Sequence, residues 1–338
     1  MSLVETTHYP GAEMVLAQLS FVGVSAILNT YGVGRSLASV AWLAYRRIRY
    51  WLFTLAGRNP LSSGRAAVPY AKDRQVVRVL SEIRNSPPTK LQHDSEGRTL
   101  WQTSVGRFWT PPGAEQHYVQ LIETETRSDV YNLADSIVGP GSIVLDCGAN
   151  VGFITRQAIE KGAALVVCFE PSPGTAVCLR KNFADEIAAG RVCVVEKGLW
   201  DKDDTLFLKT GRVANPASHS LGQAEGATGV YVPVTTIDRV VEQLNLPRVD
   251  VIKMDIEGAE VNALKGATET IRKFRPRIGI GTEHTSDLIA NNEAVIDTIL
   301  KLDDSYQYVC TETHPYRSPS KGLVLTPHTL FFSSTKTV

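Results

Sequence analysis

A short segment from Asp146 to Gly152 (DCGANVG) holds the residue types best suited to binding a ligand. An apolar run precedes it and an amphipathic stretch follows it, which is typical of a turn from a strand into a helix. Gly148 and Gly152 permit a tight turn and a close approach of the backbone, and the following helix begins with free N–H groups. We expect Asp146, at the strand end, to meet a cationic group such as an amino-acid ammonium. A capping aspartate in an ordinary glycine turn is the alternative.

A second acidic residue, Glu170, follows the next apolar run and precedes Pro171. A carboxylate at this place can accept hydrogen bonds from both hydroxyls of a ribose, which nucleoside cofactors share. The alternative is a solvated glutamate at the start of a helix. Asn150 occupies the place of the second glycine in G-x-G-x-x-G, the fingerprint that seats a pyrophosphate. The segment therefore argues against a nicotinamide oxidoreductase.

Two more apolar runs end in charged residues. The third ends at Glu196, where adenine commonly lies in such folds, although an ordinary exposed ion pair also explains this residue. The fourth ends in the sequence KMDIEGAE, which begins at Lys253, and charges so closely spaced at a strand end are hard to explain as core. Asp255 and Glu257 could instead favour the positive end of the next helix, and Glu260 could be a solvated helix residue. We expect Lys253 to pair with a neighbouring carboxylate.

These residues must be placed by a sheet, because ligands of open α/β sheets bind outside the carboxyl ends of the strands. After Gly141, short apolar runs alternate with amphipathic stretches, which predicts a parallel sheet covered by helices. The predicted strands are Ile143 to Asp146, Leu165 to Phe169, Val192 to Val195, Val249 to Met254 and Arg277 to Gly281. The helix predicted after the fourth strand places Val261, Leu264, Ala267 and Ile271 on one face.

The chain ends in two strand-like runs, Tyr306 to Thr311 and Leu323 to Ser333. The turn-rich segment between them leaves no room for a crossover helix, so the two strands must be antiparallel. The sequence therefore predicts a doubly wound α/β fold with a seven-stranded sheet and an antiparallel last strand.

Length and composition limit the function. A chain of 338 residues suits one catalytic domain with a smaller appendage. Lys plus Arg and Asp plus Glu number 35 each, so no overall charge attracts nucleic acid, and we expect no such partner. The five cysteines form no C-x-x-C pair, which favours a reduced, cytoplasmic setting.

The N-terminal segment complicates this picture. From Met14 to Gly34 there is no charged residue, and four arginines follow it by position 49. The stretch is long enough to span a bilayer, but its polar residues dilute its hydropathy. A pair of core helices over 14–31 and 36–54 is the alternative. Residues 14–54 thus predict either a membrane contact, with the body at the inner face, or an ordinary helical extension.

The chain divides into three parts. Residues 55–72 are rich in Gly, Pro and Ser and read as a linker. A helix over 73–87, paired strands from Thr99 to Trp109 and a helix from Ala114 to Val138 follow. We assign 1–56 to an apolar helical segment, 57–138 to the linker and a small accessory region, and 139–338 to the catalytic domain.

Several motifs in this order resemble the FkbM family of methyltransferases over about residues 95–335. They are DCGANVG at 146, FEP at 169, L-x-x-N at 179, T-x-D at 236, KMDIEGAE at 253 and L-x-G-A at 264. The resemblance implies a Rossmann-like, class I, S-adenosylmethionine (SAM)-dependent O-methyltransferase that acts on a sugar, glycoconjugate or other secondary-metabolite hydroxyl. It implies SAM contacts at Asp146, Gly148, Asn150, Gly152, Glu170 and Glu196.

Methyl transfer to an alcohol benefits from a base that removes the hydroxyl proton. Asp255 is our first choice, because it ends the fourth strand, and Glu257, His219 and His284 are the reserves. Asp255 with Glu257 could ligate a divalent cation, but two carboxylates alone do not make such a site, and we predict no metal. A membrane-associated binding protein without catalysis is the rival interpretation. The sequence does not identify the acceptor substrate.

Overall fold

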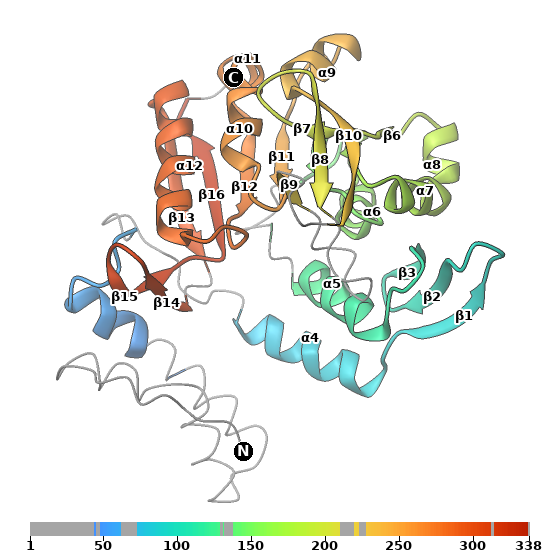
Figure 1. The fold of residues 1–338 in the computed structure, drawn as a ribbon, viewed down its shortest axis with the longest axis horizontal. Helices are drawn as coiled ribbons and strands as arrows, with labels where there is room; N and C mark the ends of the chain where they lie inside the picture. Colours follow the sequence, from blue (N-terminus) through green and yellow to red (C-terminus); the bar gives the residue numbers. More distant parts are fainter. Residues whose placement is uncertain are drawn as a thin grey trace, which may run out of the picture.

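The computed structural model describes residues 44, 48–61, 73–128, 131, 138–209, 220–222, 228–311 and 314–336. Its centre is a seven-stranded sheet in the order β13-β16-β12-β11-β4-β5-β6 (Figure 1). These strands are β4 Ile143–Cys147, β5 Leu165–Phe169, β6 Val192–Val195, β11 Val251–Met254, β12 Arg277–Gly281, β13 Tyr306–Thr311 and β16 Thr329–Ser334. All five predicted parallel strands are confirmed, to within two residues at their ends.

The pairing directions confirm the doubly wound sheet with an antiparallel last strand. β4 is parallel to both β5 and β11, and β11 is parallel to β12. β16, the last strand of the chain, lies between β12 and β13 and is antiparallel to both. The carboxyl ends of β4, β5, β11 and β12 therefore meet along one edge of the sheet, which is where such folds bind ligands.

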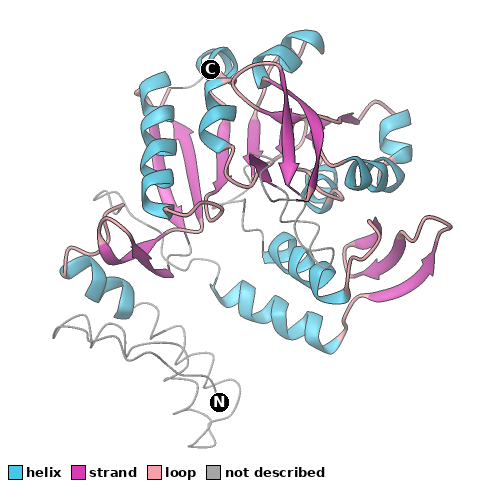
Figure 2. Cartoon of the chain, viewed as in Figure 1, coloured by secondary structure: helices cyan, strands magenta, loops and turns pink. Residues whose placement is uncertain are grey.

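Helices cover both faces of this sheet (Figure 2). Leu145 of β4 packs in the core of one face with Leu264, whereas its neighbour Val144 packs in the core of the other face with Phe153. Burial on both faces explains why the strands read as continuous apolar runs. The first face carries α9 Ile237–Gln243, α10 Glu260–Lys265, α11 Thr268–Phe274 and α12 Leu288–Leu302. The second carries α5 Gln116–Ser128, α6 Phe153–Glu160, α7 Pro173–Asn182 and α8 Ala184–Ala188.

The single helix predicted after β11 is two short helices, α10 and α11, which meet at Gly266. A Cβ at Gly266 would lie 2.2 Å from the backbone oxygen of Trp200, so only a glycine fits there. The carboxylate of Asp238 then accepts hydrogen bonds from the N–H groups of Glu269 and Thr270 and caps α11. Asp238 belongs to the T-x-D motif and Gly266 to the L-x-G-A motif. The two motifs thus fix α9 against the junction between α10 and α11.

The accessory region before the sheet consists of α4 Asp73–Asn85, β1 Thr89–His93, β2 Thr99–Thr103 and β3 Gly106–Thr110, followed by α5. The predicted helix and the paired strands are confirmed. β1 was not predicted, because all five of its side chains are exposed and its sequence does not alternate. The helix predicted from Ala114 to Val138 is described from Gln116 to Ser128, and most of the rest lies outside the described residues.

A second sheet, in the order β7-β10-β8-β9, was also not predicted. It consists of β7 Gly198–Leu199, β8 Asp204–Lys209, β9 Ser220–Gly222 and β10 Gly229–Thr235. Two of these strands have three residues or fewer, too few for an alternating pattern to be read.

The predicted run from Leu323 to Ser333 is two strands, because Pro327 separates β15 Gly322–Thr326 from β16. β15 pairs with β14 His314–Ser318 in a hairpin beside the large sheet. Residues 48–55 form a helix, which packs Tyr50 and Phe53 against Leu325 of this hairpin. The N-terminal part of the described chain is therefore anchored to the C-terminal part.

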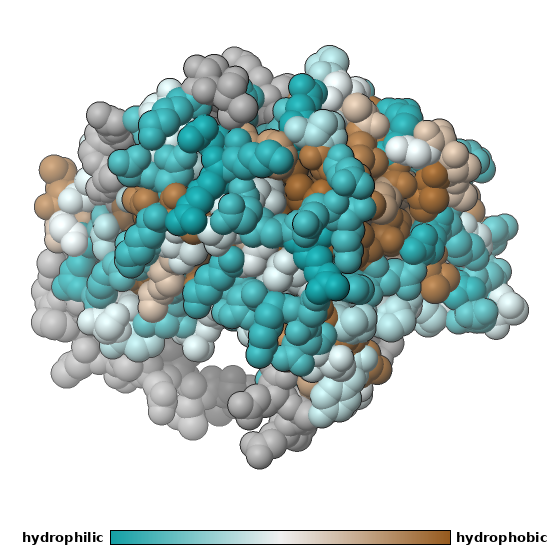
Figure 3. Space-filling model, turned by 90° about the horizontal axis from the view of Figure 1, so that it is seen from above, coloured by the Kyte–Doolittle hydropathy of each residue, from teal (hydrophilic) through white to brown (hydrophobic). Residues whose placement is uncertain are grey.

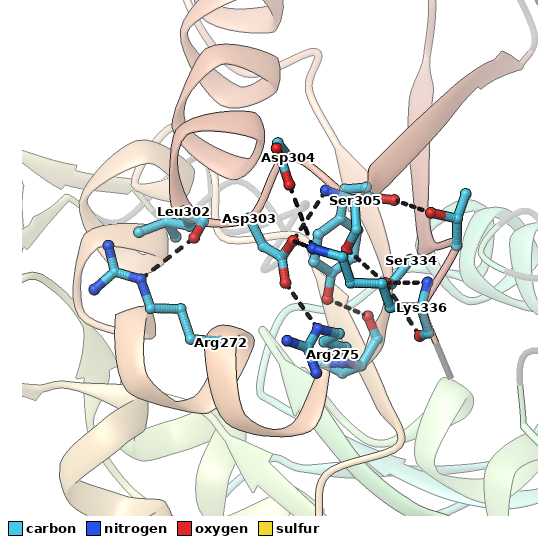
Figure 4. Close-up of polar contacts among 11 residues, drawn as sticks. Arg272, Arg275, Leu302, Asp303, Asp304, Ser305, Ser334 and Lys336 are labelled. Carbon is cyan, nitrogen blue, oxygen red and sulfur yellow. Dashed lines mark hydrogen bonds and ion pairs between the residues drawn. The ribbon is translucent and has the colours of Figure 1, made fainter. Parts of the chain in front are cut away.

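Ion pairs tie the elements together away from the carboxyl edge (Figure 4). Asp303, after α12, accepts a hydrogen bond from Arg275 at 2.8 Å and one from the N–H of Ser305 at 2.9 Å. These bonds, with Lys336 near the chain end, join α11, α12 and β16. Seen from above, the molecule is mostly hydrophilic, and apolar side chains gather towards one side (Figure 3).

No helix in the described part of the chain is long and apolar enough to cross a membrane. The span predicted from Met14 to Gly34 lies outside the described residues, as does most of the 14–54 segment.

Candidate active site

A cavity of about 340 Å³ opens at the carboxyl edge of the sheet. The loop after β4 and Glu170 after β5 line one end of it, and Asp255 after β11 and His284 after β12 line the other. Glu125 of α5 also lines the cavity, and α5 lies below the sheet in Figure 1. The cavity is therefore built mainly by residues that follow strands of the large sheet, by α5, and by strands of the small sheet.

The glycine loop is shaped by contacts within the protein. Gly148 has φ 80°, and a Cβ there would lie 1.9 Å from the backbone oxygen of Asp255. Gly152 has φ 96°, and a Cβ there would lie 2.1 Å from the ring of Phe183. Gly148 and Asn150 line the cavity, whereas Gly152 lets the start of α6 pack on α7. Gly152 does not line the cavity in this structure, and its predicted contact with SAM stays a prediction.

Asp146 does meet an ammonium, but it is the ammonium of Lys253. Its Oδ1 lies 3.3 Å from Lys253 Nζ, and its Oδ2 accepts a hydrogen bond from the Thr155 hydroxyl at 2.7 Å. The Asp146 carboxylate is fully buried and does not line the cavity. In this structure Asp146 therefore lies behind the cavity wall, and its predicted contact with a bound cofactor stays a prediction.

Lys253 connects two strand ends, as expected of a lysine paired with a neighbouring carboxylate. Besides Asp146, its Nζ donates to the backbone oxygen of Gly148 at 2.8 Å. Burial acts to lower the pKa of Lys253, but the charges of Asp146 and Asp255 outweigh it and raise this pKa. Lys253 stays charged and holds the glycine loop against β11.

Glu170 presents its carboxylate to the cavity. Backbone N–H groups hold both oxygens: Ser172 donates to Oε1 at 2.8 Å and Asn150 donates to Oε2 at 3.0 Å. Burial raises the pKa of Glu170 to about 7, and these two hydrogen bonds limit the rise. The Tyr118 hydroxyl donates to the Asn150 side chain at 2.6 Å and fixes this part of the loop. Glu170 is therefore rigid and ready to accept further hydrogen bonds.

Glu196 does not line the cavity. It is half-exposed and pairs with Arg180 of α7, which is the ordinary surface ion pair considered as its alternative. Its neighbours Lys197 and Gly198 line the cavity instead. Lys197 and Gly198, rather than Glu196, are therefore the residues after β6 that line the cavity, and the predicted contact of Glu196 with adenine stays a prediction.

At the other end of the cavity, His284 lies between two carboxylates. Its Nε2 is 2.8 Å from Asp255 Oδ1, and its Nδ1 is 3.1 Å from Glu257 Oε2. Burial lowers the pKa of His284, but the two carboxylates outweigh it and raise this pKa to about 11. The Tyr131 hydroxyl donates to Asp255 Oδ2 at 2.8 Å. Burial raises the pKa of Asp255, but His284, Lys253 and Tyr131 hold it well below its usual range. Asp255 is consequently a weak base.

This group is also the place where a metal ion could be held. Asp255, Glu257 and His284 each offer a ligand atom, and these atoms lie within 4.8 Å of one another. Both ring nitrogens of His284 already face carboxylates, and a cation would have to displace a proton that this imidazole holds tightly. The ion pairs account for the arrangement without a metal.

Glu260 is fully buried, and the alternative of a solvated helix residue is wrong. Its Oε1 accepts a hydrogen bond from the N–H of Gly258 at 3.1 Å. Glu257, within the same loop, has φ 57°. Glu260 thus supports the loop that carries Asp255 and Glu257 to the cavity.

His219 lies outside the described residues, so its predicted role stays a prediction. Glu125 and Tyr131 line the cavity, but sequence analysis missed both of them. Nothing in the helical pattern of α5 distinguishes Glu125 from the nearby Glu123, which is buried and binds the backbone N–H of Ser104.

A doubly wound seven-stranded sheet with an antiparallel last strand, and a cavity at its carboxyl edge, is the class I methyltransferase fold. Within this fold, residues 146–310 match the family model described as the methyltransferase FkbM domain. This part of the chain is therefore an FkbM methyltransferase domain, as the sequence motifs implied.

Two relatives share part of the chain. The chain is 27% identical over 158 residues to the hexuronic acid methyltransferase AglP of Haloferax volcanii. The aligned part is 47% of this chain and 58% of that protein. The chain is also 27% identical over 183 residues to the 2-O-methyltransferase NoeI of Sinorhizobium fredii, which covers 50% of this chain and 74% of that protein. The chain thus spans less than two thirds of the first relative.

Among solved structures, an FkbM methyltransferase from Methylobacillus flagellatus is similar. The sequence identity is 19% and the TM-score is 0.40, over 65% of this chain and 56% of that one.

Proposed function

We propose that this chain transfers the methyl group of SAM to a hydroxyl group of a sugar, a glycan or another secondary metabolite. The observation that carries the proposal is the cavity of an FkbM domain, with Glu170 at one end and the Asp255–Glu257–His284 group at the other. When bound, SAM supplies a methyl group activated by a sulfonium. The chain aligns the hydroxyl with it, and alignment is the larger part of such catalysis.

The residues of the cavity fit this cofactor. Glu170 offers acceptors for two ribose hydroxyls, because backbone N–H groups already orient its carboxylate. Phe169, Leu199 and Leu221 line the same end and suit a flat apolar base. The carboxylates of Asp255 and Glu257 suit the positive charge of a sulfonium or an ammonium. The volume of about 340 Å³ lies at the lower end of the range for small-molecule sites.

The relatives favour a sugar as the acceptor. One is named for a hexuronic acid and another for a 2-O position. A sugar hydroxyl needs hydrogen-bond acceptors, and the end of the cavity near Asp255 provides carboxylates from α5 and from the loop after β11. The acceptor is therefore assigned to this end.

Calorimetry on the full chain tests the cofactor site through Glu170→Gln. This change removes the charge that accepts the ribose hydrogen bonds, and we expect SAM affinity to fall by about tenfold to a hundredfold, since hydrogen bonds to charged groups contribute about 1.5–3 kcal/mol. Glu196→Gln is the matched control, because Glu196 lies outside the cavity, and it should bind SAM like the wild type.

Two results would contradict the proposal. A folded wild-type chain that does not bind SAM would overturn it, and equal affinity in Glu170→Gln would remove Glu170 from the site. A product assay with SAM and a panel of sugars then separates an enzyme from a binding protein that lacks turnover. No observation on the described residues favours the binding protein.

We also propose that the N-terminal segment contacts a membrane surface. The helix of residues 48–55 leaves Trp51 and Leu55 exposed by 61% and 82%, with Ile48 and Leu52 beside them. Their spacing of three and four residues forms one apolar face, and the arginines at 46 and 47 adjoin it in the sequence. This arrangement supports contact with an anionic lipid surface.

A further inference from the structure

Helix α5 directs one acidic side chain into the cavity. Tyr118, Val119 and Ile122 bury the helix against the sheet, and Gln157 of α6 donates a hydrogen bond to the backbone oxygen of Thr126 at 2.8 Å. Glu125 lies between these anchors and lines the cavity with its helix neighbours Leu121 and Ile122. α5 precedes the matched FkbM segment, so this carboxylate belongs to the part of the chain outside it.

Glu125 differs from the other carboxylates of the cavity. Glu170 accepts two backbone hydrogen bonds, and Asp255 and Glu257 face His284. Within the described ranges of the chain, no hydrogen bond or ion pair joins the Glu125 carboxylate to another residue. Among the described carboxylates of the cavity, that of Glu125 is therefore the one free to receive a proton.

The geometry points to Glu125 as the general base that removes the proton of the acceptor hydroxyl, an inference that rests on the proposed function. The O–H bond of the acceptor breaks and its proton passes to the Glu125 carboxylate. The acceptor oxygen forms a bond with the methyl carbon, while the carbon–sulfur bond breaks and leaves its electron pair on sulfur. A carboxylate and a sulfonium thus become a carboxylic acid and a neutral thioether, and the charges balance.

The surrounding charges suit this step. Burial raises the pKa of Glu125 to about 7, and the negative charge of Asp255 adds to the rise. His328, Lys253 and His284 face it as well and act in the opposite direction. A base is most effective when its pKa is near the working pH, which Glu125 satisfies and Asp255 does not.

Carbon-13 NMR of the full chain, labelled at the glutamate carboxyls, tests the first step without any acceptor. We expect a carboxyl that titrates near pH 7 and disappears in Glu125→Gln, separate from the one that disappears in Glu170→Gln. If the only signal that titrates there is that of Glu170, Glu125 is ionised or neutral throughout, and the proposal is overturned. The titration does not depend on methyl transfer, so its result is independent of whether the proposed function is correct.

Turnover tests the second step, with the sugar that the wild-type chain methylates in the product assay. Glu125→Gln should lower kcat at pH 7 by about 10²- to 10⁴-fold, leave KM nearly unchanged and abolish the rise of kcat through pH 7. SAM affinity by calorimetry should not change, which shows that the variant is folded. Glu115→Gln, an exposed change just before α5, is the control. A kcat within twofold of the wild type, with the same pH profile, would overturn the inference, whereas a wild type that binds no SAM would overturn the proposed function.

Discussion

At the scale of single residues, the ion pair between Lys253, which lines the cavity, and Asp146, which lies behind the cavity wall, shows how buried charges support a site. Asp146 is fully buried, and Lys253 is nearly so. Their charges are compensated by each other, by Thr155 and by the backbone oxygen of Gly148. Removal of one partner leaves the other as an uncompensated charge in the interior, which is far more costly than loss of a surface pair.

We therefore expect Lys253→Met to lower the free energy of unfolding by about 3–5 kcal/mol, measured by urea denaturation. Lys301→Met is the control: Lys301 is exposed and pairs with Asp297, so its loss should change this free energy by about 0.5 kcal/mol or less. Replacement of both Lys253 and Asp146 by apolar residues should recover part of the stability. A loss below about 1 kcal/mol for Lys253→Met would show that Asp146 finds another partner.

Sequence analysis identified the chemistry of these residues better than their partners. The motif around Asp146 predicted contact with the ammonium of a ligand, and the KMDIEGAE segment predicted that Lys253 pairs with a neighbouring carboxylate. That this carboxylate is Asp146 depends on β4 and β11 being adjacent, which no local pattern states. Glu125 was missed for a related reason, because only the packing of α5 shows which of its acids faces the cavity.

At the scale of elements, the site depends on how closely the loop after β4 approaches the end of β11. The backbone of Gly148 lies against the carbonyl of Asp255, and the N–H of Asp255 donates to the backbone oxygen of Cys147 at 3.0 Å. The five parallel strands could be predicted because they are buried on both faces. β1 could not, because all its side chains are exposed, and neither could β7 and β9, because they have three residues or fewer.

Gly148→Ala tests this approach. The alanine would have a left-handed φ, which costs about 1–2 kcal/mol, and its Cβ would also clash with the Asp255 carbonyl. Gly190→Ala is the matched control, because Gly190 has φ 71° but nothing within 4 Å of its Cβ position. We expect calorimetry to show a Tm lower by several degrees for Gly148→Ala than for Gly190→Ala, at about 2–4 °C per kcal/mol. Equal Tm values for the two variants would mean that the end of β11 moves away from residue 148 with little loss of stability.

At the scale of the whole molecule, the helix of residues 48–55 is fixed to the catalytic domain. Tyr50 and Phe53 fasten this helix to the β14–β15 hairpin, and the N–H of Leu325 donates to the backbone oxygen of Arg58 at 2.9 Å. The opposite face, with Trp51 and Leu55, is exposed. A membrane contact made there would hold the catalytic domain close to the surface, because the helix packs directly on the hairpin.

Co-sedimentation of the full chain with vesicles tests this contact. Trp51→Ser with Leu55→Ser should weaken binding to vesicles that contain anionic lipid by about tenfold or more, because two large apolar side chains each contribute about 1.5–3 kcal/mol when buried. Leu244→Ser, at an exposed apolar residue of another surface, should bind like the wild type. The arginines near the helix predict that added salt weakens binding further, since charge attraction to the lipid is screened. If the wild-type chain does not sediment with these vesicles, the exposed face of residues 48–55 is not a membrane contact, and the apolar N-terminal sequence is better explained as a helical extension.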